Sequence, residues 1–259
     1  MDLQRANVLI KSKKHGGLLY AHTYGEPSTP NEFFANVKSI DPDLLILDDR
    51  CLCLPDLEPA SDSTADITLY STGYAKIVEL NFGGYAFLKE SIAYRPVHLS
   101  FNSKDHKELE KFYKESISAR TPFNYLDTNW LDTNSEVPAW YDYRQKIESY
   151  MNDSLAHRRT LNEIYSSRLP AEIQLPEAYQ TWRFNVRVDD NKRMMDAIFN
   201  KGLFASSHYA SLAGIMADGQ APQAEKLADE VINLFNDGHF AVEQAEQVCG
   251  IIRENLSWN

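Results

Sequence analysis

A short apolar run that stops at two carboxylates constrains the fold of this chain more than any other feature. Residues Leu44 to Leu47 are all aliphatic, and Asp48 and Asp49 follow them directly. A run this short and this apolar is typical of a strand in a parallel sheet that is covered on both faces. Because open α/β sheets bind ligands at the carboxyl ends of their strands, the aspartates stand where a functional carboxylate is expected.

Further strands are expected on either side of this run. They are predicted at Gly17–Tyr24, Ile67–Ser71 and Tyr85–Leu88. Between the first strand and the apolar run, Pro30–Ile40 carries apolar residues at helical spacing. This order of strand, helix and further strands predicts an α/β layer with right-handed crossovers.

The rest of the chain is predicted to be helical at first and then mixed. Two apolar stripes, within residues 109–117 and 140–165, are typical of core helices. From Trp182 to Val188, apolar residues alternate with polar ones, including Arg183 and Asn185, which predicts a half-buried strand. The elements expected after it are a helix at 191–200, a strand at 203–209, and helices at 222–234 and 240–256.

Composition and charge argue against several classes of protein. The chain of 259 residues has a net charge of −11, whereas nonspecific binding to nucleic acid or to an anionic membrane needs a basic face. Its three cysteines form neither a disulfide framework nor a metal-ligand pattern, and no segment approaches a membrane span. We therefore expect a cytoplasmic protein with no nucleic-acid partner, no membrane partner and no metal site.

A lysine with distinctive neighbours follows the third expected strand. Ser71 ends that strand, Lys76 comes five residues later, and the pair Gly83 and Gly84 follows. A pyridoxal phosphate (PLP) enzyme presents its groups in this way, since a carboxylate meets the pyridine nitrogen and a lysine forms a Schiff base with the aldehyde. Taken singly, each feature is weak, because most lysines after strands are solvated and most strand-end aspartates are helix caps.

Taken together, these features resemble the DegT/DnrJ/StrS family of PLP-dependent sugar aminotransferases, which has the aspartate-aminotransferase fold. The resemblance runs nearly end to end. In chain order, the matching stretches are Ala21–Gly25 (Val-His-x-Tyr-Gly in the family), Leu47–Asp49 (Ile-Glu-Asp), Ser71–Lys76 with Gly83 and Gly84 (Ser-x-x-x-x-Lys), His157–Tyr165 (Arg-x-x-Asn-x-x-Tyr) and Gly202–Tyr209 (Gly-Ile-x-x-x-x-His-Tyr).

The resemblance implies pyridoxal 5'-phosphate as the cofactor and assigns roles to four residues. Asp49 would pair with the pyridine nitrogen and keep it protonated. Lys76 would hold the aldehyde and later act as the base that moves the substrate proton. Ser71 would donate a hydrogen bond to the phosphate, and His208 would face the substrate side of the cleft.

The resemblance also implies a fold class, a substrate class and partners. The fold would be α/β, a truncated PLP fold-type-I large domain in residues 1–135, a helical connection in 136–180 and a small α+β C-terminal domain in 181–259. The substrate would be a keto-sugar nucleotide, with an amino donor, in lipopolysaccharide or other sugar biosynthesis. A homodimer is expected, because the family builds its sites at a subunit interface.

Several departures from the family pattern leave alternatives open. Leu52 stands where the family has a glutamine that contacts the cofactor ring, and Thr72-Gly73 stands where it has an aromatic residue and histidine. The family's N-terminal segment, with the turn that holds the cofactor phosphate, has no counterpart before the first strand. We therefore expect weak PLP binding by this chain alone. The alternatives are a complementing N-terminal chain, a noncatalytic member that keeps the fold as a binding or scaffold partner, and an unrelated α/β enzyme.

Overall fold

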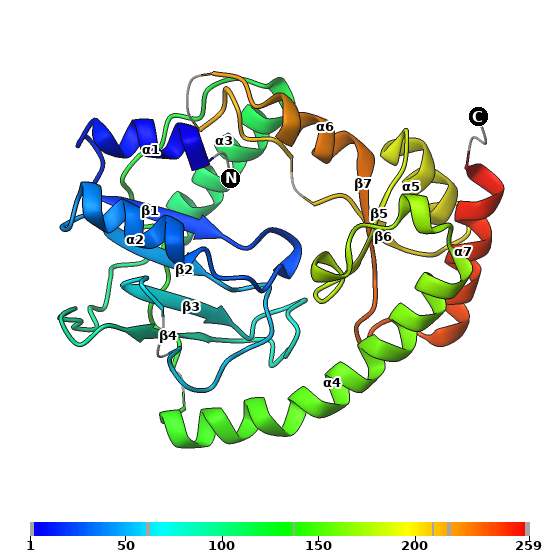
Figure 1. Cartoon of the computed structure of the whole chain (residues 1–259), viewed down its shortest axis with the longest axis horizontal. Helices are drawn as coiled ribbons and strands as arrows, with labels where there is room; N and C mark the ends of the chain where they lie inside the picture. Colours follow the sequence, from blue (N-terminus) through cyan, green and yellow to red (C-terminus); the bar gives the residue numbers. More distant parts are fainter. Residues whose placement is uncertain (1–2, 61–62, 137, 209, 217–218, 257–259) are drawn as a thin grey trace.

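Two β-sheets and a long helix that runs past both of them define the architecture (Figure 1). The structure is a computed structural model, and it describes residues 3–60, 63–136, 138–208, 210–216 and 219–256. The strand order is β1-β2-β3-β4 in the first sheet and β5-β7-β6 in the second. The long helix is α4, Trp140–Arg168.

The first sheet contains the four strands expected in the N-terminal part. Strands β1 (Gly17–Ala21), β2 (Leu45–Asp49) and β3 (Ile67–Ser71) are parallel, whereas β4 (Gly84–Leu88) pairs with β3 in the antiparallel direction. Helix α2 (Asn31–Ile40) connects β1 to β2, as the apolar spacing predicts. The four strands are neighbours in chain order, and β1 and β4 form the two edges.

One face of this sheet is covered by helices α1 (Leu3–Lys11) and α2. Phe34 and Val37 of α2 are fully buried in one apolar cluster with Ile46 of β2. Along β2, buried residues alternate with partly exposed ones, and Leu19 on β1 is 53% exposed. The prediction of cover on both faces is therefore wrong for β2, because Ile46 and Asp48 on one face are buried, whereas the residues on its other face are only partly buried.

Helix α4 takes part in the cores of both sheets. Its N-terminal residues Tyr143 and Ile147 are buried in a cluster that includes Tyr85 of β4. Its C-terminal residues Leu161 and Tyr165 are buried in the large cluster of the second sheet. The domain limits at 135 and 180 stay a prediction, since a single continuous helix spans the connection between them.

The second sheet is antiparallel, with β7 in its centre. Its strands are β5 (Phe184–Arg187), β6 (Ala205–Ser206) and β7 (Val231–Leu234). The remaining helices are α3 (Ser103–Ala119), α5 (Asn191–Phe199), α6 (Pro222–Glu230) and α7 (Val242–Asn255), with single turns of 3₁₀ helix at Thr23–Gly25, Ala171–Ile173 and Glu177–Tyr179.

Two predictions about this C-terminal part are wrong. The expected helix at 222–234 ends at Glu230, because Val231–Leu234 is fully buried and pairs on both sides as the central strand. The alternation expected over Trp182–Val188 also fails at Arg183 and Asn185, which are buried beside their apolar neighbours, although Arg187 is exposed. Both side chains have polar partners inside the protein, which makes their burial tolerable.

The strand expected at 203–209 is short, because only Ala205 and Ser206 pair with β7. Tyr209 lies outside the described residues. Among the residues that the structure describes, no helix is long and apolar enough to cross a lipid bilayer. The same residues contain no cluster of three or more histidine, cysteine or acidic side chains that could hold a metal ion.

The central position of β7 generates a stability prediction. Leu234→Ala should lower the free energy of unfolding by about 2–5 kcal/mol, because it opens a cavity in the second core. The matched change Leu126→Ala, at a position that is 54% exposed, should cost about 0.5 kcal/mol or less. Urea unfolding measures both values, and equal losses would contradict this assignment of the core.

Candidate functional site

A cavity of about 1090 Å³ is lined by the carboxyl ends of β1 and β2, the turn after β3, and residues within 210–212 and 220–228. Asp49 and Lys76 both line it, together with Tyr24 and Leu52. Two of the four residues singled out from the sequence therefore meet in one cavity, at the edge of the sheet where ligands are expected.

The two consecutive aspartates at the end of β2 face opposite ways. Asp48 is 1% exposed, on the face of the strand that packs against the helices, whereas Asp49 is partly exposed and lines the cavity. Side chains alternate along a strand, so only one of the pair can face the cavity. The structure places Asp49 there, with its Oδ1 accepting a hydrogen bond from the Cys51 amide at 3.0 Å.

Asp48 instead belongs to a buried polar group that joins the ends of β1 and β2. His22 Nε2 lies 2.6 Å from Asp48 Oδ1, and Arg50 Nε donates to Asp48 Oδ2 at 2.8 Å. The other ring nitrogen of His22 lies 2.6 Å from the Glu26 carbonyl oxygen. Burial favours the neutral acid, but the hydrogen bonds from His22 and Arg50 outweigh it and lower the pKa of Asp48.

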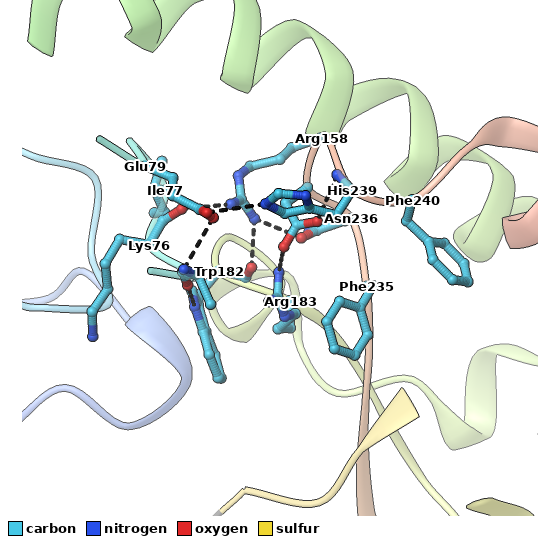
Figure 2. A network of polar contacts seen from close by, with 12 residues as sticks. Lys76, Ile77, Glu79, Arg158, Trp182, Arg183, Phe235, Asn236, His239 and Phe240 are labelled. Carbon is cyan, nitrogen blue, oxygen red and sulfur yellow. Dashed lines mark hydrogen bonds and ion pairs between the residues drawn. The ribbon is translucent and has the colours of Figure 1, made fainter. Parts of the chain in front are cut away.

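Lys76 lies in a turn whose backbone is fixed by buried polar contacts. Ala75, just before it, has a φ of 59°, which is uncommon for a residue other than glycine. Figure 2 shows the backbone of the turn facing a polar network and the Lys76 side chain pointing away from that network. The Lys76 side chain therefore lines the cavity, while its carbonyl oxygen is hydrogen-bonded to Arg158 of α4.

Electrostatics agree with this placement of Lys76 and Asp49. Burial raises the pKa of the Cys51 thiol to about 12, and the adjacent Asp49 adds to this, whereas the positive charge of Lys76 acts in the opposite direction. Burial lowers the pKa of His208, and the charges of Arg183 and Lys76 add to that shift. The charge of Lys76 is thus close enough to affect Cys51, which lines the cavity, and His208, which lies next to it.

Ser71 is not brought into the lining of this cavity. Its side chain is partly buried, and its Oγ accepts a hydrogen bond from the Gly73 amide at 3.3 Å. The hydroxyl therefore supports the local turn after β3. Its expected role as a phosphate donor stays a prediction.

His208 is held next to the cavity by its neighbours and does not itself line the cavity. Its backbone amide donates to Asn233 Oδ1 at 2.8 Å, and its carbonyl oxygen accepts from the Tyr24 hydroxyl at 3.0 Å. Its ring meets that of Trp182 edge to face, with the ring centroids 5.2 Å apart. The predicted substrate-side role of His208 stays a prediction.

The turn between β1 and α2 requires glycine at its tightest point. Gly25 has a φ of 79°, and a Cβ atom there would lie 2.4 Å from the Leu52 carbonyl oxygen. Leu52 itself lines the cavity, so the position that departs from the family's glutamine presents an apolar side chain there.

Sequence reasoning missed the residues that hold the lysine turn. Arg158 is 3% exposed, and its Nη2 donates to the Lys76 carbonyl oxygen at 2.9 Å. Trp182 is also 3% exposed, and its Nε1 donates to the Ala75 carbonyl oxygen at 2.7 Å. Arg158 lies in the family-like stretch His157–Tyr165, and that resemblance could have pointed to it. No local sequence feature links Trp182 to the lysine.

The lining of the cavity suits PLP in two respects. It offers one carboxylate for the ring nitrogen and one amine for the aldehyde, and its volume exceeds what the cofactor alone needs. For the phosphate, the cationic side chains among the described lining residues are Arg5 and Lys76. The donor set therefore fits the reactive ring better than it fits the phosphate.

Comparisons with known proteins show which solved structures share this fold. No family model matches the chain, and no curated protein matches it.

Solved structures do match. A sugar aminotransferase from Micromonospora echinospora has a TM-score of 0.66 at 15% identity, with 98% of this chain and 71% of that chain covered. A DegT DnrJ EryC1 StrS aminotransferase from Brucella abortus has a TM-score of 0.61 at 13% identity, with 99% and 70% covered. An aminotransferase from Streptoalloteichus hindustanus has a TM-score of 0.60 at 18% identity, with 94% and 67% covered.

These similarities confirm the expected fold class. The chain has the α/β architecture of PLP fold-type-I sugar aminotransferases of the DegT/DnrJ/EryC1/StrS type, and it spans about 67–71% of the length of these three structures. The resemblance found in the sequence is thus confirmed at the level of the fold.

The opposite orientations of the two aspartates generate a stability prediction. Asp48→Asn should lower the free energy of unfolding by about 3 kcal/mol, because it removes the charge that pairs with a largely buried Arg50. Asp49→Asn should change it by about 1 kcal/mol or less, since that carboxylate accepts a single backbone hydrogen bond. Thermal or urea unfolding measures both, and a larger loss for Asp49→Asn would show that the register is reversed.

The lowered pKa of Asp48 generates a prediction about pH. A carboxyl group whose pKa is lower in the folded state contributes stability above its unfolded pKa of about 4, and that contribution disappears as the pH falls through the folded pKa. The native protein should therefore exceed Asp48→Asn in stability at pH 7, and the gap should narrow below about pH 4. A gap that is constant from pH 7 to pH 3 in urea unfolding would contradict the assignment.

Proposed function

We propose that this chain is a PLP-dependent aminotransferase-like protein that acts on a keto-sugar nucleotide. The observation that carries this proposal is the meeting of Asp49 and Lys76 in one cavity at the carboxyl edge of the first sheet. The fold shared with sugar aminotransferases supports the same reaction class.

The two residues have complementary chemical tasks. When bound, PLP supplies an aldehyde that reacts with amines and a ring that accepts electrons. The carboxylate of Asp49 would keep the ring nitrogen protonated, and the Cys51 amide orients that carboxylate. The Lys76 amine would hold the aldehyde carbon and, once released by the incoming amino donor, take a proton from one carbon and return it to another.

The size of the cavity supports a substrate larger than an amino acid. At about 1090 Å³ it lies slightly above the usual range of about 300–1,000 Å³ for small-molecule sites, so it has room for a sugar and nucleotide beside the cofactor. A further similar structure, with a TM-score of 0.65 at 13% identity and with 98% of this chain and 65% of that chain covered, was solved in the presence of its TDP-sugar product. The amino donor would use the same cavity in the alternate half of the reaction.

The phosphate of the cofactor would be held only weakly by the residues described here. A helix N-terminus with several free amides is the usual anchor, whereas single charge-assisted hydrogen bonds contribute only about 1.5–3 kcal/mol each. Ser71 lies outside the cavity lining, so this chain by itself offers few donors. A second chain, either another copy in a homodimer or a complementing N-terminal segment, would complete the site of this cytoplasmic enzyme.

Cofactor trapping tests the proposal. The protein is mixed with PLP and reduced with borohydride, which fixes the cofactor on the amine that holds it, and peptide mapping then locates the label. The label should lie on Lys76 in the native protein and disappear from that peptide in Lys76→Arg. Asp49→Asn should shift the visible spectrum and lower affinity by about tenfold or more, because the ring nitrogen loses a charged partner.

The control for this experiment is a lysine on the far part of the chain. Lys192 on α5 has a side chain that is 84% exposed, and it should carry no more label than other surface lysines. A label spread evenly over surface lysines would refute the assignment of Lys76. Failure to trap PLP on Lys76, even at millimolar concentration, would favour the noncatalytic alternative.

A further inference from the structure

The turn that carries Lys76 is held in a conformation that its own sequence does not favour. Ala75 has a φ of 59°, in the left-handed region where glycine is the usual residue. Such a backbone conformation persists only where the surrounding structure fixes it. The contacts around the turn therefore show what determines the position of the lysine.

Those contacts come from residues far along the chain (Figure 2). Trp182 Nε1 donates to the Ala75 carbonyl oxygen at 2.7 Å, and Arg158 Nη2 donates to the Lys76 carbonyl oxygen at 2.9 Å. Both donor side chains are only 3% exposed, so water has little access to replace either bond. The peptide groups before and after the Cα atom of Lys76 are thus both fixed by the C-terminal half of the molecule.

A third contact, made by the Glu79 carboxylate, links the start of the lysine turn to His239. Glu79 Oε2 accepts a hydrogen bond from the Ala75 amide at 3.0 Å, and Glu79 Oε1 lies 3.0 Å from His239 Nε2. His239 precedes α7, so this carboxylate also joins the turn to the second sheet's side of the protein. Unlike the first two donors, His239 is largely exposed, with 61% of its side chain accessible, which makes it the weaker link.

Trp182 also touches the other segments that border the cavity. Its ring meets the His208 ring edge to face at 5.2 Å between centroids. It belongs to a buried apolar cluster with Tyr24, from the turn after β1, and Ile77, from the lysine turn. One side chain therefore connects three segments around the cavity.

We propose that Trp182 and Arg158 are positioning residues that fix the lysine turn so that the Lys76 amine is directed into the cavity. The proposal rests on the proposed function, because only a reacting lysine gives this orientation a chemical purpose. The proposal also means that residues in the C-terminal half of the chain determine the position of Lys76. A displacement of that half on ligand binding would therefore also move the Lys76 amine.

The test compares two variants with a matched control. Trp182→Phe keeps an aromatic ring and removes the donor to Ala75, and Arg158→Lys keeps a cation and removes the planar fork. The control is Trp140→Phe, because Trp140 packs against Tyr85 and is 41% exposed. Brief acetylation of the protein without cofactor, followed by peptide mass spectrometry, gives the labelling rate of Lys76 relative to Lys192.

Release of the turn should raise that relative rate by about fivefold or more in Trp182→Phe and in Arg158→Lys, since each loses a hydrogen bond to a buried carbonyl. With PLP added, both variants should show an altered absorption spectrum and less trapping on Lys76. Trp140→Phe should stay within about twofold of the native protein in each measurement. Unchanged labelling and unchanged spectra in two folded variants would overturn the proposal.

The outcomes separate this proposal from the proposed function. If native protein traps no PLP but the variants release Lys76, the positioning role stands and the function fails. If PLP is trapped on Lys76 equally in native protein and variants, the function stands and the positioning role fails. If the variants do not fold, hydrogen exchange of the native protein tests whether the lysine turn is held in place. Slow exchange of the peptide 74–80, at the rate of β7, supports the proposal, and exchange at the rate of an exposed loop overturns it.

Discussion

The hydrogen bonds of the buried Arg158 guanidinium are the interactions on which the packing of the lysine turn against the second sheet depends. It donates hydrogen bonds to the Lys76 carbonyl oxygen at 2.9 Å, to the Trp182 carbonyl oxygen at 2.6 Å and to Asn236 Oδ1 at 2.6 Å. A buried cation is strongly unfavourable unless its donors are satisfied. The partners come from the lysine turn, the residues just before β5 and the residues just after β7, so satisfying this one side chain of α4 requires all three segments to meet there.

A second buried cation, the guanidinium of Arg183, lies beside the first and is stabilised differently, because its Nε has no hydrogen-bond partner among the residues that the structure describes. Arg183 pairs with Asp237, and its guanidinium lies 4.3 Å from the centroid of the Phe235 ring. The guanidinium also lies 5.2 Å from the centroid of the Trp182 ring, so the charge is offset by one carboxylate and two aromatic rings. The two arginines and their partners form a buried polar region behind the lysine turn, while the cavity in front of it is lined by Asp49, Leu52 and Tyr24. Backbone contacts on one side and space on the other suit a side chain that must be held in place to react.

The candidate site could be predicted in part because some of its geometry is local. Because side chains alternate along a strand, Asp48 and Asp49 had to face opposite ways, and the resemblance to the family selected Asp49 as the one that faces the cavity. Ser71 and His208 were placed by resemblance, and the structure leaves both outside the cavity lining. Their positions depend on how the chain turns after β3 and after β6, and such turns are determined by distant partners such as Asn233.

The sequence by itself determined the four strands of the first sheet, the helix between β1 and β2, and the carboxylate and amine that meet in the cavity. Those features depend on side-chain periodicity and on motifs only a few residues long. Only the tertiary structure decided that Val231–Leu234 is the central strand of the second sheet, that Arg183 and Asn185 are buried, and that Trp182 holds the lysine turn. A short apolar run suits a helix or a strand equally well, and a polar residue can be buried wherever a partner is available. Those choices are made by hydrogen bonds between residues far apart in the chain, which no local pattern records.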